Sequence, residues 1–212
     1  MKARRTAAFS LVELLILIFI IAILAGMLLP ALANAKGRAQ RISCVNNLKQ
    51  VGLGFRLFHN DHQDKFPMSL STNKSGSLEL ADQAYRHFQT LSNELSSPRV
   101  LVCPSDNRAP AAAFRDLKNP NVSYFVGLDT ALTKLEMFQM FLSGDRNLEN
   151  GEPMTSSIMS LKKGQNLKWT DELHRNAGNI GLADGSVQQT TSARASEMLS
   201  QAGAETNRLV FP

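Results

Sequence analysis

The chain is poor in cysteine, tryptophan and histidine. Its 212 residues include two cysteines, one tryptophan and four histidines, and aromatic residues make up only 7%. Two cysteines alone offer too few ligands for a metal site. So small a share of aromatic rings does not indicate a platform on which single-stranded nucleic acid stacks its bases.

The motifs of common enzymes are also missing. The sequence has no glycine-rich phosphate loop and no nucleophile elbow, and His59, His62, His87 and His174 are scattered along it. We therefore predict that the protein is not an enzyme, that it has no catalytic residues and that it holds no cofactor.

Positive charge is concentrated at the start of the chain. The formal net charge is +5, and Lys2, Arg4 and Arg5 supply three of these charges, so that the remainder carries +2. A charge this low gives little long-range attraction for nucleic acid. No nucleic-acid partner is expected.

A long apolar run follows the basic residues. Residues 14–29 carry no charge, and with their apolar neighbours they reach the roughly 20 residues that a helix needs to cross a bilayer. A secretory signal peptide is an alternative, but the apolar region is long for one and the helical pattern continues past Lys36. A plain anchor with its basic end in the cytoplasm is another. The plain anchor leaves Glu13 unexplained, because a carboxylate inside a membrane helix costs about 2.5–3.5 kcal/mol.

The segment 5–15, Arg-Thr-Ala-Ala-Phe-Ser-Leu-Val-Glu-Leu-Leu, resembles the N-terminal signal of type IV pilins and type II secretion pseudopilins. In that family a prepilin peptidase cuts just before a Phe and methylates the new amino terminus. The resemblance implies a leader of residues 1–8, cut between Ala8 and Phe9, with Glu13 fifth in the mature chain. Ala8 departs from the Gly usual at this position. Pro30 falls where the family commonly has a helix-kinking proline.

The resemblance also implies an assembly role. Residues 9–30 are expected to form a membrane and filament-core helix, in which the amine of Phe9 pairs with Glu13 of a neighbouring subunit and sets the register. The expected partners are the prepilin peptidase, like subunits or other pilins and pseudopilins, and the inner membrane, with the rest of the chain on the periplasmic or external side. Two other hypotheses stay open: a membrane-anchored minor pilin or envelope module whose head captures a surface, a substrate or DNA, and a membrane-anchored enzyme.

Beyond the membrane run the helical pattern continues. Apolar residues at steps of three and four predict an amphipathic helix over residues 31–60, where Gly52 and Gly54 allow a close approach. Residues 61–212 are predicted to form a globular head. The resemblance implies an α+β, pilin-like fold, with the long helix packed on a small antiparallel sheet.

Within the head, short patterns predict individual elements. We expect a helix over residues 81–95, strands over residues 100–103 and 122–128, and either a helix or a strand over residues 131–142. Residues 145–153 are predicted to be a polar loop. The oxygen-bearing side chains of this loop lack the spacing of an EF-hand, so we predict a solvated turn and no metal; they are Asp145, Asn147, Glu149, Asn150 and Glu152.

Two cysteine motifs extend the resemblance to a large group of pilin-like proteins. They are Cys-Val-Asn-Asn-Leu-Lys-Gln from Cys44 and Cys-Pro-Ser-Asp from Cys103. Both cysteines would lie beyond the membrane in an oxidising compartment, which favours a disulfide between them. Two unpaired thiols are the alternative.

A histidine and an Asp-Gly pair mark the last third of the chain. Apolar residues flank Asp184 and Gly185, which predicts a hairpin of residues 179–183 and 186–190 closed by a type I′ turn. His174 stands ten residues before Asp184, a spacing that recurs in the resembled group. It either anchors the hairpin through hydrogen bonds or forms a metal-binding or catalytic pair with the aspartate.

Overall fold

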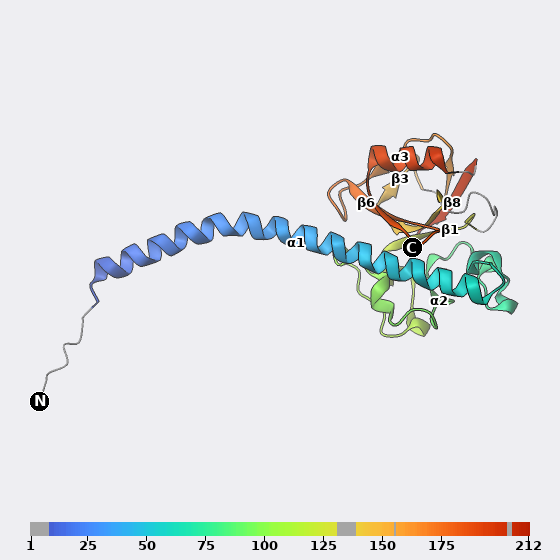
Figure 1. Ribbon diagram of the computed structural model, residues 1–212, viewed down its shortest axis with the longest axis horizontal. Coiled ribbons are helices and arrows are strands. Elements are labelled where there is room, and N and C mark those ends of the chain that lie inside the picture. The colour runs from blue at the N-terminus through green and yellow to red at the C-terminus, as the bar shows by residue number, and fades with distance from the viewer. Residues whose placement is uncertain (1–8, 131–138, 155, 203–204) are drawn as a thin grey trace, which may run out of the picture. The chain divides into compact units, whose positions relative to one another are not determined.

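The computed structural model describes residues 9–130, 139–154, 156–202 and 205–212. The predicted leader, with Ala8 and the expected cleavage bond, lies outside these residues, as does most of the ambiguous segment 131–142. The chain divides into two compact units, Met1–Ala39 and Gln40–Pro212. Figure 1 shows the described elements in chain order.

Helix α1 runs from Leu11 to Asp61 and belongs to both units, with Pro30 inside it. Its N-terminus has a capping box: the backbone N–H of Glu13 donates to Ser10 Oγ at 3.2 Å, and that of Ser10 donates to Glu13 Oε2 at 2.9 Å. In the first unit the described part of α1 is exposed throughout. An 18-residue window there has a mean hydropathy of 3.0, so α1 is long and apolar enough to cross a membrane.

The second unit is built on a six-stranded antiparallel sheet with the strand order β4-β8-β1-β2-β6-β7. These strands are β1 (Tyr124–Gly127), β2 (Phe141–Asp145), β4 (Ile158–Lys162), β6 (Ala177–Leu182), β7 (Val187–Thr191) and β8 (Thr206–Val210). A separate pair joins β3 (Leu148–Glu149) to β5 (Lys168–Trp169).

Two short α-helices and several 3-10 helices complete the described part of this unit. The α-helices are α2 (Ala84–Gln89) and α3 (Ser192–Gln201). The 3-10 helices are Pro67–Ser69, Thr72–Lys74, Leu78–Leu80, Pro98–Leu101, Phe114–Asp116 and Asn119–Asn121.

The sheet separates two hydrophobic cores. Side chains alternate along a strand, so they reach both cores. Tyr124 and Val126 of β1 pack with the second part of α1, the part from Cys44 onward, whereas Phe125 packs with α3. Figure 1 shows α3 and the last turns of α1 on opposite sides of the sheet. The predicted α+β class, a long helix packed on a small antiparallel sheet, is confirmed.

From Cys44 onward α1 buries one face. Its fully covered apolar residues are Cys44, Leu48, Val51, Phe55 and Phe58. The predicted helix over residues 31–60 is therefore present, and its apolar stripe is buried against the head from Cys44 onward, whereas the stripe residues before Cys44 are exposed.

Two glycines of α1 permit close packing. A Cβ on Gly52 would lie 3.4 Å from the Cα of Gly185, and a Cβ on Gly54 would lie 2.8 Å from Leu95 Cδ2.

The hairpin of β6 and β7 is confirmed, but its turn is not type I′. That turn requires positive φ at both central residues, whereas only Gly185 of the pair has it, at 85°. The N–H of Gly185 donates to the carbonyl of Leu182, and the N–H of Leu182 donates to that of Ser186. The connection therefore has three residues and ends in a left-handed glycine.

The other local predictions had mixed outcomes. The strand over residues 122–128 is confirmed as β1, but the expected helix over 81–95 is limited to α2. The strand expected over 100–103 is wrong, because Pro98 and the side chain of Ser97, which accepts from the N–H of Arg99, start a 3-10 helix there. The polar loop expected over 145–153 is wrong at its start, where Asp145 ends β2 and is fully buried.

Candidate functional site

A buried disulfide connects α1 to the loop before the sheet. Cys44 and Cys103 are bonded, their Cα atoms are 5.0 Å apart, and neither side chain is exposed. The structure thus has the pairing expected from the sequence, and the bond spans 59 residues. Closing a loop of that length stabilises the fold by about 4 kcal/mol on the chain-entropy model.

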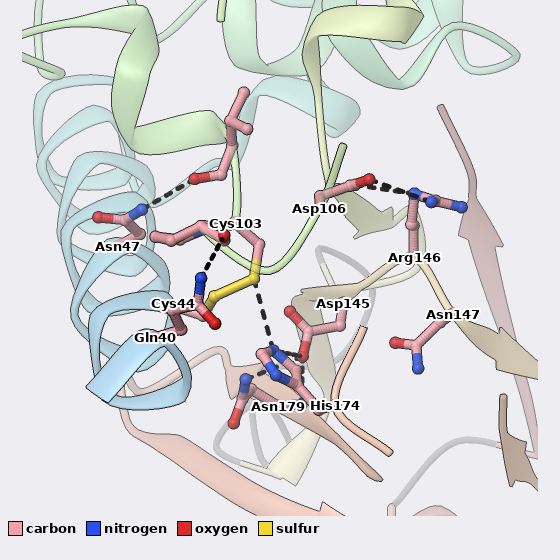
Figure 2. The surroundings of a disulfide bond; sticks show 12 residues. Gln40, Cys44, Asn47, Cys103, Asp106, Asp145, Arg146, Asn147, His174 and Asn179 are labelled. Atoms are coloured by element: carbon pink, nitrogen blue, oxygen red, sulfur yellow. Dashed lines mark hydrogen bonds and ion pairs between the residues drawn. A yellow bond between two sulfur atoms is a disulfide. The ribbon is translucent and has the colours of Figure 1, made fainter. Parts of the chain in front are cut away.

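Hydrogen bonds on both sides of the disulfide align its two segments. Gln40 Nε2 donates to the carbonyl of Pro104 at 3.2 Å, and Asn47 Nδ2 donates to that of Val102 at 3.0 Å (Figure 2). Gln40 and Asn47 lie one turn before and one turn after Cys44 on α1. The residues around Cys44 therefore bind the backbone on both sides of Cys103.

His174, in the segment before β6, points at this disulfide. Its Nε2 atom lies 3.4 Å from Cys103 Sγ and 3.3 Å from Asp145 Oδ2, and its side chain is almost completely buried (Figure 2). Directly after it, Arg175 and Asn176 both have positive φ, at 54° and 60°. This left-handed pair turns the chain sharply between His174 and the start of β6.

Asp145 is the buried acid of the site. Its Oδ2 atom accepts from the N–H of Asn179 at 2.7 Å and from Asn179 Nδ2 at 2.8 Å, while its Oδ1 atom has no hydrogen-bond partner among the described residues. Burial raises the pKa of Asp145 to about 7, against the two bonds from Asn179 and the nearby Arg41. Asp145 is thus poised to change its charge near neutral pH.

Burial has the opposite effect on the histidine. It lowers the pKa of His174 to about 4, and the positive charge of Arg41 acts in the same direction. At neutral pH His174 is therefore an uncharged imidazole, so its 3.3 Å contact with Asp145 is not an ion pair between full charges.

Arg41 is the cation nearest to this group on α1. Its Nη2 atom donates to the carbonyl of Gly178 at 3.2 Å, and burial lowers its pKa against the attraction of Asp145. Arg41 precedes Cys44 by three residues, so the same face of α1 carries the cation and the disulfide.

A second polar pair joins the loop of Cys103 to the sheet. Arg146 donates to both carboxylate oxygens of Asp106, at 2.9 and 3.1 Å, and also to Glu172 at 2.6 Å. Asp106 closes the Cys-Pro-Ser-Asp motif, and Arg146 directly follows Asp145. Two neighbouring residues at the end of β2 thus lie close to this segment: Asp145 contacts His174, which lies against Cys103, and Arg146 binds Asp106 (Figure 2).

The structure does not pair His174 with Asp184. Asp184 Oδ1 accepts from the N–H of Ser186 at 2.8 Å, and its carbonyl accepts from Arg56 Nη1 at 2.7 Å. With Gly185 packed on Gly52, the turn is docked on α1. The hypothesis of a metal-binding or catalytic pair formed by His174 and Asp184 is therefore wrong.

Sequence reasoning missed the acid that His174 does meet. It assigned Asp145 to a solvated loop as a potential calcium ligand, yet Asp145 and Asn147 are buried, and Asn147 Nδ2 donates to the carbonyl of Thr170 at 2.8 Å. Glu149 and Glu152 are exposed instead, so these oxygens do not converge. No local pattern distinguished Asp145, because its partner is 29 residues away in the sequence.

Within the described residues, one group of donor atoms is compact enough to hold a metal ion. Cys44, Cys103 and His174 each offer an atom within 4.8 Å of the others. The premise that the two cysteines stand without further ligands is therefore wrong. With the sulfurs bonded to each other, however, they are not available as ligands.

In comparisons with protein-family models, with curated proteins and with solved structures, nothing matches this chain. The fold and the buried site therefore have to be interpreted from their own residues. The first unit presents a helix with exposed apolar side chains, and the second presents a head fixed to the same helix by a disulfide.

Proposed function

We propose that the protein is a structural subunit of a type IV pilus-like or type II secretion pseudopilus filament. In this proposal the first part of α1, up to Ala39, anchors the chain in the inner membrane, with the head on the periplasmic or external side. On assembly the same part of α1 packs among the helices of neighbouring subunits. The role is assembly and involves no catalysis by the head. The single observation that carries the proposal is the exposure of apolar side chains all round this part of α1.

An exposed apolar helix requires a partner. Leucine, isoleucine and phenylalanine residues between positions 11 and 32 are about half to three-quarters exposed, on every face of the helix. A helix that is apolar all round is stable when it is surrounded by lipid or by other helices. A subunit that moves from a membrane into a filament core meets both environments in turn.

The capping box supports the role proposed for Glu13. In the isolated chain the carboxylate is not stranded, because the N–H of Ser10 donates to it. This hydrogen bond is exposed, so an amine created at Phe9 of another subunit has access to the same carboxylate. Assembly would then exchange a neutral donor for a charged one, which forms a stronger hydrogen bond.

The attachment of the head also fits a filament subunit. Within the second unit, the disulfide at Cys44, the flanking bonds of Gln40 and Asn47 and the docked turn at Gly185 fasten the head to α1. A subunit that is moved by its helix needs such fixed attachment, because force on the helix then reaches the head through many contacts.

Processing is tested by the intact mass of the protein recovered from membranes of cells with and without a prepilin peptidase. The expected product begins at Phe9 and carries one methyl group, and it appears only where the peptidase is present. Ala8→Gly should increase its yield. An uncut chain from cells with an active peptidase would contradict the proposal and leave a static anchor with a binding head.

Assembly is tested by comparing Glu13→Gln with Ser10→Ala. Glu13→Gln keeps a side-chain acceptor for the N–H of Ser10 but removes the charge expected to pair with Phe9, whereas Ser10→Ala removes the other bond of the capping box and keeps that charge. Sedimentable filaments should be lost in Glu13→Gln and retained in Ser10→Ala. Filaments that persist in Glu13→Gln, or that are lost equally in Ser10→Ala, would contradict the role of this charge in assembly.

A further inference from the structure

We propose that the reduced protein binds one divalent cation of the zinc class through Cys44, Cys103, His174 and Asp145, at the place where the oxidised protein has its disulfide. The inference depends only on the second unit and does not rest on the proposed filament function. All four donors come from different elements: α1, the loop after Leu101, the segment before β6 and the end of β2.

Three of the four donors, Cys44, Cys103 and His174, already lie within 4.8 Å of one another, and the fourth, Asp145, lies beside His174. Zinc binds sulfur at about 2.3 Å and nitrogen or oxygen at about 2.0–2.2 Å, so neighbouring ligands in a tetrahedron are about 3.3–3.8 Å apart. His174 Nε2 lies 3.3 Å from Asp145 Oδ2 and 3.4 Å from Cys103 Sγ. Two adjustments complete the site: the two sulfurs, bonded in the oxidised chain, separate by rotation of the cysteine side chains, and Asp145, which does not lie within 4.8 Å of all three other donors, moves closer to the sulfurs.

Asp145 supplies an independent indication of a missing ligand. It is fully buried, and its Oδ1 atom has no partner among the described residues. A buried carboxylate oxygen without a partner is costly, and a cation held by this carboxylate would remove that cost. The two bonds from Asn179 meanwhile hold the carboxylate in place, as outer partners of metal ligands commonly do.

The charges of the site also balance. Two thiolates and one carboxylate together carry three negative charges, which a divalent cation and the guanidinium of Arg41 neutralise. Arg41 acts electrostatically on both Asp145 and His174. Since charges are buried at low cost only when they are compensated, the loaded site is compatible with complete burial.

Loading and disulfide formation exclude each other. Each thiol loses its proton when it binds the cation, so uptake of one ion releases two protons from the sulfurs, and a third where Asp145 is protonated, and changes no oxidation state. Cysteines are synthesised as thiols, so a newly made chain needs no reductant to bind the ion. A thiol oxidant that later removes two electrons from the sulfurs forms the disulfide and releases the cation. The metal would thus hold Cys103 against α1 before the covalent bond forms.

The test uses the full chain in detergent, produced in a reducing cytoplasm and divided into a reduced and an oxidised sample. Co²⁺ is titrated into each as a spectroscopic probe, and Zn²⁺ is then added in competition. The reduced protein should bind one Co²⁺ with a thiolate charge-transfer band, protect both thiols from alkylation and lose the band to Zn²⁺. The oxidised protein should bind none at this place.

Variants separate this site from nonspecific thiol binding. His174→Ala and Asp145→Asn should each weaken Zn²⁺ binding by about tenfold or more, since even outer partners of metal ligands are worth that much. His62→Ala, which removes a histidine directly after the end of α1, should leave binding unchanged. The wild-type titrations decide the proposal even if a variant fails to fold. It is overturned if the reduced protein gives no thiolate band, if the oxidised protein binds equally well, or if folded His174→Ala binds as wild type does.

Discussion

The two parts of α1 differ in where their partners are. Up to Ala39 the described helix exposes apolar side chains on all faces, whereas from Cys44 it buries one face completely against the head. The backbone is the same continuous helix in both parts. The helix therefore forms whether or not its side chains are buried. In the second part the head of the same chain buries the apolar face, whereas in the first part only lipid or another molecule can cover the apolar side chains.

Mutating a buried aromatic of the second part should give the largest effect. Phe55 is completely buried and its ring lies 6.0 Å from that of Phe88. Phe55→Ala should lower the free energy of unfolding of the head by about 3–5 kcal/mol, because it leaves a cavity. Urea unfolding followed by tryptophan fluorescence measures this. Ile20→Ala is the matched control in the first part, and a comparable loss there would contradict the distinction.

A positive charge in the first part of α1 should weaken membrane insertion and leave the stability of the head unchanged. Ile20→Arg should disfavour membrane insertion by about 2.5–3.5 kcal/mol, with unfolding of the head unchanged. The readout is the fraction of protein that remains with membranes after an alkaline wash. Leu53→Arg, on an exposed position of the second part, should not reduce that fraction. Membrane retention of Ile20→Arg equal to wild type would refute the assignment of this part to lipid.

The stability of the second unit should depend on pH through Asp145 and His174. The pKa of Asp145 is raised in the fold to about 7, so the folded state binds more protons than the unfolded state between about pH 4 and 7, and its contribution to stability falls as pH rises. His174, whose pKa is lowered to about 4, contributes in the opposite direction below about pH 6.5. Asp145→Asn removes only the first contribution.

Stability of Asp145→Asn should therefore rise relative to wild type as pH increases from 4 to 7, by at most about 1.4 kcal/mol per pH unit. Urea midpoints at several pH values measure the difference. Asp64→Asn, at an exposed acid, is the matched control and should follow wild type. A difference between Asp145→Asn and wild type that does not vary with pH would show that Asp145 does not titrate in this range.

The smallest effect is expected on the outer face of the second part. Leu53 is 57% exposed although it lies two residues from the buried Val51. Leu53→Gln should change the free energy of unfolding by less than about 0.5 kcal/mol, since it alters no buried contact. Val51→Ala should lower it by several times as much. Similar losses in both would show that a partner also covers the outer face.

Local sequence was informative where one periodicity dominated. The apolar run, the helical repeat after it and the Asp-Gly hairpin each depend on residues close together in the chain, and each element is present in the structure. Short apolar segments such as 100–103 were not decided by their pattern, because a run of four residues fits a strand or a turn of helix equally well. There the capping residues Ser97 and Pro98 decided the outcome.

The sequence by itself determined a long helix with an apolar first part, a charged residue at its start and two cysteines as the natural pair for a disulfide. It did not determine the centre formed by Asp145, His174 and Asn179. That centre depends on the order of strands in the sheet and on a left-handed turn at Arg175 and Asn176, which together place residues from distant segments beside Cys103. Burial, which raises the pKa of one of these groups and lowers that of another, exists only once the sheet and α1 have packed together.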